Sequence, residues 1–296
     1  MKDILEKRAA IVRGIRRFFD DQGFIEVETA VRIAAPAPEE HIDCPPVVGG
    51  GYLRASPELQ MKKLLAVGMD KIYQIGPCFR EGEKGSRHNP EFTMIEWYRK
   101  GANYLDIKRD LEGLLGDLVV VCSCGRTEED RDFDIRCTPT TSDYHLLRVR
   151  DAYLRYAGWD PWESWDQDRF DFDMATKIEP AIKELGGGVF LMDYPPQAAS
   201  LSKLRGDVAE RWEFYWDGME LANCFTELCD KDEQLKRFEM AKESRKLLNE
   251  ADYPIDSEFI ESLPLVGRAA GVALGVDRLV MILTKTKEIS AVRARI

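Results

Sequence analysis

The stretch Gln74–Tyr98, QIGPCFREGEKGSRHNPEFTMIEWY, predicts a β-hairpin with a charged connecting loop. Its first apolar strand runs as far as Phe79, and the apolar run that starts at Phe92 begins the second strand. We expect Gly82 and Gly85 to take positive φ angles in the loop, because glycine does so without steric cost. The sequence therefore predicts two antiparallel strands that hold a charged loop between them.

Two side chains of this hairpin suggest a chemical role. Arg80, at the end of the first strand, carries a planar and permanently charged guanidinium group that fits a phosphate well. Phe92 offers a ring face on which a base can stack. An ordinary solvated hairpin is the alternative interpretation when the stretch is considered alone.

The composition indicates a globular protein without a general nucleic-acid-binding surface. The 296 residues are enough for one large α/β domain or two small ones, and the formal net charge is −11. Because a general nucleic-acid-binding surface needs clustered Lys and Arg, such a surface is not expected. No apolar run approaches the roughly 20 residues of a membrane span, and the charged N-terminus lacks a signal-peptide pattern. We expect a cytoplasmic protein without a membrane segment.

The cysteines indicate reduced thiols. Seven cysteines are irregularly spaced, and the loose cluster of Cys122, Cys124 and Cys137 lacks the paired spacing and nearby histidines of a zinc site. Reduced thiols in a cytoplasm are the simpler interpretation.

Apolar periodicity predicts helices and strands in alternation. In the first half we expect a helix over Lys2–Gln22, a strand over Phe24–Thr29, an irregular segment over Ala34–Pro46, a strand over Gly51–Ala55, a helix through Leu59–Ala66 with Ser56 as cap and Pro57 first, and a helix over Leu105–Val121. In the second half we expect an exposed excursion over Cys122–Tyr144, helices over Arg150–Ala157, Phe172–Leu185 and Asp232–Leu248, strands over Val189–Met192, Trp212–Trp216, Met219–Phe225 and Ala270–Val276, and a final helix from Asp277. This order favours an α+β fold around a mostly antiparallel sheet.

Charged residues in these elements suggest a phosphate and metal site. We expect Arg80 and Arg278, on neighbouring strands, to clamp a phosphate from two sides, with a helix N-terminus at Asp277–Arg278 adding a positive dipole end. Glu213 and Glu220 flank a turn, so in a regular hairpin both carboxylates can lie on one face and hold a hard cation such as Mg²⁺. Two solvent-facing glutamates are the alternative.

Three further carboxylates suggest a ligand with amino groups. Glu58, Glu96 and Glu227 stand beside apolar or aromatic neighbours, and burying them is costly unless a cation pairs with them. A ligand with two amino groups would supply that partner. For each residue singly, an ordinary surface carboxylate is the alternative.

These stretches together resemble known synthetase motifs. Gly23–Thr29, Phe79–Arg80 with Arg87–Thr93, and Gly271–Arg278 resemble motifs 1, 2 and 3 of class II aminoacyl-tRNA synthetases. Ser56–Glu58, His88–Tyr98 and Glu220–Leu228 resemble the lysyl branch. The resemblance implies one class II synthetase catalytic domain over residues 1–296. It is weakest between about residues 116 and 188, which we expect to be a divergent insertion.

Within the lysyl branch, the chain is most similar to the short paralogues that act as elongation factor P lysine ligases. The first motif helix starts near Met1, so we expect no anticodon-binding OB domain. The acidic balance agrees with this, and tRNA binding is not expected. The resemblance implies ATP-dependent activation of lysine or (R)-β-lysine as an adenylate, transfer to a lysine of elongation factor P, and a homodimer. A truncated lysyl-tRNA synthetase that charges tRNA or another small acceptor, and a catalytically inactive regulatory paralogue, are the alternatives.

The resemblance also implies roles for individual residues. Arg80 and Arg278 would be catalytic, and Glu213 and Glu220 would hold Mg²⁺. The ATP contacts would come from Arg80, Glu83, His88, Asn89, Phe92, Glu220, Leu221, Gly275 and Arg278. The contacts to the amino-acid substrate would come from Ser56, Pro57, Glu58, Glu96, Tyr98, Asn223, Phe225, Glu227 and Ala273.

Four positions depart from the family pattern. Gly82 replaces the motif 2 glutamate that reads adenine, and we expect Glu83 to take its place. Ala30 replaces the usual motif 1 proline, and Cys224 replaces the usual glycine between Asn223 and Phe225. Ala273 replaces a glycine in motif 3, and its methyl group, worth roughly 1–3 kcal/mol in discrimination, suggests a preference for the β-amino isomer.

Overall fold

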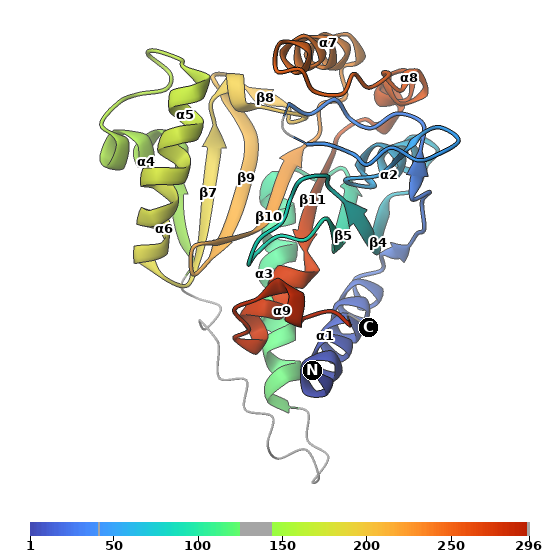
Figure 1. Ribbon diagram of the computed structural model, residues 1–296, viewed down its shortest axis with the longest axis vertical. Helices are drawn as coiled ribbons and strands as arrows, with labels where there is room; N and C mark the ends of the chain where they lie inside the picture. The colour runs from blue at the N-terminus through green and yellow to red at the C-terminus, as the bar shows by residue number, and fades with distance from the viewer. Residues whose placement is uncertain (41, 125–143, 295–296) are drawn as a thin grey trace.

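Within residues 1–40, 42–124 and 144–294, which the computed structural model describes, nine strands form one twisted sheet (Figure 1). Its order is β1-β4-β5-β11-β10-β9-β7-β6, and β8 pairs with β9. The pairs are antiparallel except β1–β4 and β6–β7. The strands are β1 (Ile25–Glu26), β4 (Lys71–Phe79), β5 (Glu91–Lys100), β6 (His145–Arg148), β7 (Gly188–Tyr194), β8 (Leu204–Arg205), β9 (Val208–Trp216), β10 (Met219–Thr226) and β11 (Ala269–Gly275), while β2 (Arg32–Ile33) and β3 (Tyr52–Leu53) pair separately. The expected α+β fold is confirmed.

The hairpin predicted over Gln74–Tyr98 is formed by β4 and β5. Ile75 pairs with Ile95, and Phe79 pairs with Glu91 across the start of the loop. Gly82 has φ +78°, as expected. The same expectation is wrong for Gly85, whose backbone exchanges hydrogen bonds with His88 in a small antiparallel bridge. A bridge of this kind uses ordinary extended backbone, so no positive φ is needed there.

One face of the sheet is covered by three helices. These are α1 (Lys2–Asp21), α3 (Tyr104–Cys124) and α9 (Val276–Thr284). Their apolar stripes bury Phe19, Leu115 and Val280 against Trp97 of β5 and Val272 of β11 in the main hydrophobic core. Each large side chain buried in this way contributes about 1.5–3 kcal/mol of hydrophobic stabilisation.

Two separate groups of helices cover the opposite face. The first group packs against β7 and β9 and comprises α4 (Val149–Ala152), α5 (Gln167–Asp173) and α6 (Glu179–Leu185), joined by π-helical turns over Tyr153–Ala157 and Met174–Ile178. The second comprises α2 (Glu58–Ala66), α7 (Lys231–Leu247) and α8 (Ser257–Val266). Figure 1 shows α4 to α6 at the left of the view and α7 and α8 at its top. The middle strands β5, β11 and β10 run between the two groups.

Most predicted elements are confirmed, with shifted ends that have physical causes. The strand expected over Phe24–Thr29 keeps only two paired residues, because the Thr29 amide and hydroxyl donate instead to the Gln74 side chain, at 3.0 and 2.9 Å. The helix expected from Phe172 begins at Gln167, where Asp166 accepts a capping hydrogen bond. At α2, Pro57 is the capping position and the Ser56 hydroxyl accepts from the Glu58 amide at 3.0 Å.

The excursion expected over Cys122–Tyr144 is mostly outside the described residues. Residues 122–124 continue α3, so the helix ends later than expected. Tyr144, the last residue of the expected excursion, is partly buried, and its ring makes edge contacts with Phe190 and Phe214. The loose cysteine cluster is not described at side-chain level. Among the cysteines that are, Cys44, Cys78, Cys224 and Cys229 are free thiols.

No helix in the described part of the chain is sufficiently long and apolar to cross a membrane. This agrees with the absence of such a run in the sequence pattern.

Gly271 provides a test of the packing on the site face. A Cβ at this position would lie 2.1 Å from Cδ1 of Tyr98, its partner across β5 and β11. Because Tyr98 is buried and cannot move freely, we predict that Gly271→Ala lowers the free energy of unfolding by about 1–3 kcal/mol. Urea unfolding measures the loss.

The matched control is Gly275→Ala on the same strand. Its Cβ would meet nothing nearer than the Arg278 side chain at 3.8 Å, and its φ of −73° suits alanine. We expect its unfolding free energy to stay within about 0.5 kcal/mol of the parent. Equal stability of the two variants would contradict the packing argument.

Candidate active site

The site face is produced by the alternation of side chains along four neighbouring strands, β5, β11, β10 and β9. On β5, Ile95 and Trp97 face the main core, so Glu96 and Tyr98 face the opposite side. On β11, Val272 faces the core and leaves Ala273 on the site side. On β9 and β10 the same rule places Arg211, Glu213, Tyr215, Glu220, Asn223 and Phe225 on one face, and the register shifts by a bulge between Glu220 and Ala222.

A cavity of about 510 Å³ opens on this face. Most residues that the resemblance assigns to ATP or the amino acid line it. These are Ser56, Glu58, Arg80, Glu83, His88, Asn89, Phe92, Glu220, Leu221, Asn223, Phe225, Ala273, Gly275 and Arg278. The remaining four substrate residues, Pro57, Glu96, Tyr98 and Glu227, are buried and do not line the cavity itself.

Arg80 and Phe92 lie together at the loop end of the β4–β5 hairpin, Arg80 just after β4 and Phe92 near the start of β5. The Arg80 guanidinium stands 5.3 Å from the centroid of the Phe92 ring, an arrangement that stabilises the cation against the aromatic face. Nη1 of Arg80 is 3.4 Å from the Glu83 carboxylate. The loop therefore holds a cation, a ring and a carboxylate at the cavity wall.

Arg278 reaches the same cavity from the first turn of α9. Its guanidinium donates to the Glu220 carbonyl at 2.7 Å and to Nε2 of His88 at 2.6 Å. Since arginine only donates, the imidazole accepts at Nε2, and burial together with the Arg278 charge lowers the His88 pKa. The expectation that Arg80 and Arg278 stand on neighbouring strands is wrong, because Arg80 follows the end of β4 and Arg278 lies in α9, and β5 separates β4 from β11.

Carboxylates converge beside Arg278. Burial and repulsion by Glu213 raise the pKa of Glu220, and burial with repulsion by both of these residues raises the pKa of Glu179 on α6. Glu213 accepts from Arg211 at 2.6 Å and from the Tyr215 hydroxyl at 2.7 Å. Among the described residues, no group of three or more His, Cys, Asp or Glu is arranged as a closed metal site. The donor oxygens of Glu213 and Glu220, which repel each other, are nevertheless of the type that suits a hard cation.

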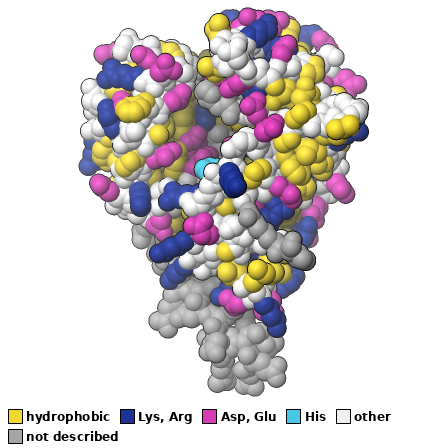
Figure 2. Space-filling view, in the orientation of Figure 1, with side chains coloured by type: hydrophobic (Ala, Val, Ile, Leu, Met, Phe, Trp, Pro, Cys, Tyr) yellow, Lys and Arg dark blue, Asp and Glu magenta, His cyan; other side chains and the backbone are white. Residues whose placement is uncertain are grey.

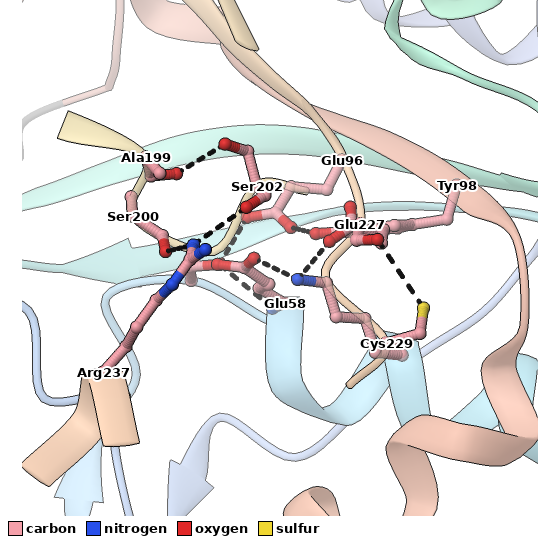
Figure 3. Close-up of polar contacts among 11 residues, drawn as sticks. Glu58, Glu96, Tyr98, Ala199, Ser200, Ser202, Glu227, Cys229 and Arg237 are labelled. Carbon is pink, nitrogen blue, oxygen red and sulfur yellow. Dashed lines mark hydrogen bonds and ion pairs between the residues drawn. The ribbon is translucent and has the colours of Figure 1, made fainter. Parts of the chain in front are cut away.

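A buried lysine lies beneath the cavity. Lys62 on α2 is 1% exposed, and its ammonium is 2.6 Å from the Glu58 carboxylate and bonded to Glu227 as well. The two carboxylates raise the Lys62 pKa above its ordinary value despite burial. Figure 3 shows Glu58 and Glu227 directed toward this shared nitrogen from α2 and from the end of β10. The chain thus supplies one internal cation to its own acidic pocket.

Glu96 is the third buried carboxylate of this pocket. It accepts from the Ser56 hydroxyl at 2.6 Å and from the Tyr98 hydroxyl at 2.8 Å (Figure 3). Burial, with repulsion from Glu58, raises its pKa to about 7. Burial likewise raises the pKa of Glu227 to about 8. Ser56 thereby connects the cavity lining to the buried acidic floor.

Three site residues were not anticipated from the sequence. Lys62 follows Glu58 by four positions on a helix, a spacing at which side chains meet, so its pairing was open to prediction. Arg211 precedes Glu213 by two positions on a strand, which puts both on one face. Glu39 lines the cavity from the irregular segment before β3, and burial with repulsion by Glu58 raises its pKa to about 7. No local pattern points to Glu39.

Removal of the internal cation should be costly. We predict that Lys62→Met, which keeps the side-chain volume, lowers the free energy of unfolding at pH 7 by about 3–5 kcal/mol, because two buried carboxylates lose their shared partner. A second substitution, Glu227→Gln, should restore part of the loss. Urea unfolding of the single and double variants measures both effects.

Lys63→Met is the matched control on the same helix. Lys63 is partly exposed and pairs with Asp256 at 2.7 Å near the surface, so its loss should cost less than about 1 kcal/mol. If the Lys62 variant were no less stable than this control, the internal-cation interpretation would be wrong.

The raised pKa of Glu96 predicts a pH dependence of stability. The ordinary pKa is 4.5, so between about pH 4.5 and 7 the folded protein retains a proton on Glu96 that the unfolded chain releases. The free energy of unfolding therefore falls as pH rises through this window. We predict a smaller fall for Glu96→Gln than for the parent, with Glu39 and Glu227 still contributing. Urea unfolding at pH 5 and pH 7 is the measurement, and equal falls in both proteins would contradict it.

Comparison of the sequence with known proteins places the chain in a family and identifies similar proteins. The family described as tRNA synthetases class II (D, K and N) matches residues 1–294. Proteins named elongation factor P--(R)-beta-lysine ligase are 38% identical in Yersinia enterocolitica and 37% identical in Proteus mirabilis, and each alignment covers 98% of this chain and 94% of the relative. The expected resemblance is confirmed. The chain belongs to the class II tRNA synthetase family of the D, K and N group.

Proposed function

We propose that this protein is an ATP-dependent ligase that activates a diamino acid and joins it to a lysine side chain of elongation factor P. The preferred amino acid is (R)-β-lysine, with α-lysine the weaker substrate. The observation that carries the proposal is the charge of the buried pocket. Glu58, Glu96 and Glu227 stand against one ammonium, that of Lys62, so two negative charges are unbalanced whenever all three carboxyl groups are ionised. A substrate with two ammonium groups balances them.

The two substrate amines would be received at different depths. Glu58 and Ser56 line the cavity, so the amine nearer the substrate carboxylate would meet Glu58. Glu96, Tyr98 and Glu227 lie below, and they would receive the side-chain ammonium. Asn223 and Phe225 would shape the wall between the two amines. Pro57 keeps Ser56 and Glu58 in place at the start of α2.

The other end of the cavity suits ATP, the nucleotide that class II synthetases use. Arg80 and Arg278 would grip the phosphates, Phe92 would stack on adenine, and Gly275 would let the nucleotide approach the backbone. The substrate carboxylate attacks the α-phosphorus, the bond to pyrophosphate breaks, and an aminoacyl-adenylate remains. The arginines stabilise the negative charge that develops on the phosphate oxygens.

Glu213 and Glu220 would hold Mg²⁺. Their carboxylates lie on one strand face, and their mutual repulsion fits a cation between them. When bound, the ion would neutralise phosphate charge. Arg211 orients Glu213 by a direct hydrogen bond, while Arg278 stays 3.5 Å from the Glu220 carboxylate.

Ala273 supports the β-amino isomer as substrate. Its methyl group lines the cavity and is paired in register with Glu96 on β5. The relatives at 37–38% identity carry (R)-β-lysine in their names. We also propose a cytoplasmic homodimer, as the family resemblance implies.

The test is an ATP–pyrophosphate exchange assay with (R)-β-lysine and α-lysine, followed by the intact mass of elongation factor P incubated with the protein, ATP and each amino acid. We expect exchange with (R)-β-lysine to be the faster, and a mass gain of one lysyl unit on elongation factor P. Absence of exchange with both isomers would refute the enzyme activity, and label on tRNA instead of protein would refute the acceptor.

Arg80→Met provides the negative control. It keeps an unbranched apolar stem and removes the guanidinium charge that would stabilise the phosphate oxygens. We expect exchange to fall at least about 100-fold, as for loss of one charge-stabilising donor.

A further inference from the structure

A second cavity, of about 940 Å³, lies beside the first and is larger. Its walls come from three parts of the chain that are far apart in sequence. Trp165 and Met174 line it from the region of α5, Tyr194 from the end of β7, and Phe238 and Met240 from α7. Figure 2 shows the surface hollowed between the part of the molecule that holds α4 to α6 and the part that holds α7 and α8.

The two cavities are continuous. Glu39, Ser200, Arg211 and Glu220 line both of them. Apart from Glu220, the residues assigned to the nucleotide, such as Arg80, Phe92 and Arg278, line the first cavity alone. The second cavity therefore reaches the reacting end of an adenylate from a side that ATP does not occupy.

We propose that this second cavity receives the acceptor, as a protein segment that presents a lysine side chain. The inference rests on the proposed ligase function and adds the route and the chemical class of the acceptor. The nucleotide and the amino acid together fill the first cavity, so an incoming nucleophile needs another entrance. The shared residues Arg211 and Glu220 mark the place where it would meet the activated carbonyl.

The charge of the lining favours a basic protein segment over a nucleic acid. Among the described residues that line the second cavity, seven are acidic and three are basic: Glu39, Glu40, Asp171, Glu179, Glu213, Glu220 and Glu233 against Arg211, Lys236 and Arg237. Two of the basic groups are already ion-paired, Arg211 with Glu213 at 2.6 Å and Arg237 with Glu233 at 3.0 Å. The remaining negative field attracts an ammonium group and repels a phosphate backbone.

The transfer step balances without a further reactant. The acceptor lysine loses one proton to solvent and becomes a neutral amine. Its lone pair forms a bond to the carbonyl carbon of the adenylate, the carbon–oxygen bond to the phosphate breaks, and AMP leaves with that electron pair. The nitrogen then releases its extra proton, which leaves an amide.

Two variants on opposite walls of the second cavity test the route: one reverses a charge on α5, and the other introduces a charge on α7. Asp171 on α5 and Met240 on α7 are both exposed, so Asp171→Arg and Met240→Arg should leave the fold intact. We expect each to lower kcat/KM for transfer to elongation factor P at least tenfold. Pyrophosphate exchange, and release of the adenylate by hydroxylamine as a small nucleophile, should stay within twofold of the parent.

Glu239→Arg is the matched control. It also places an arginine on an exposed position of α7, next to Met240, but Glu239 does not line the cavity. Transfer by this variant should equal that of the parent. Wild-type transfer rates in either the Asp171 or the Met240 variant would overturn the acceptor route. Failure of the parent protein to support pyrophosphate exchange would instead count against the proposed function, so the two failures are distinguishable.

Discussion

The site depends on the pleat of three central strands, because the same residues that build the main core fix which side chains reach the substrate. Trp97 and Val272 are buried against α1, α3 and α9, and their neighbours Glu96 and Ala273 face the other way. A register slip by one residue would bury Glu96 among aromatic rings and expose Trp97 to the cavity. The large apolar area on the helical side therefore protects the geometry of the polar side.

The acidic floor of the cavity contains three largely buried carboxyl groups whose ionised forms are costly to bury. Glu58, Glu96 and Glu227 are held close together in a low-dielectric place, where desolvation and mutual repulsion raise the pKa of Glu96 and Glu227. Lys62 offsets part of this cost with two direct contacts. In the protein alone, the raised pKa values of Glu96 and Glu227 favour their protonated forms over uncompensated charge. On the proposed function, the substrate supplies the missing cations, so affinity and specificity come from a destabilised free state.

Much of this arrangement was predictable from local patterns, and the rest depends on contacts between distant segments. Alternation and turn residues predicted the hairpins around Arg80 and Glu220, and the motifs assigned most cavity residues. The helix Ser257–Val266 was not anticipated. Nor was the placing of Glu39, whose carbonyl accepts from Arg245 at 2.7 Å across a sequence separation of 206. Arg245 is fully buried and also pairs with Asp43 at 2.6 Å. No period in the sequence marks such an anchor.

The division into two connected cavities has a consequence for the order of events. ATP and the amino acid would occupy the first cavity before any acceptor is needed, because every residue assigned to their activation lies in or below it, apart from Glu213 in the second cavity beside Glu220. An adenylate formed there would be flanked by Arg80 and Arg278 on its phosphate side and open toward Arg211 on its carbonyl side. The acceptor could then arrive without displacing the nucleotide, and AMP would leave by the entrance that ATP used. With a single entrance, the AMP part of the adenylate would block the acceptor, although AMP leaves only after the acceptor has attacked. On the proposed route, Arg211 and Glu220, which line both cavities, would stand where the acceptor meets the adenylate, and that conflict would not arise.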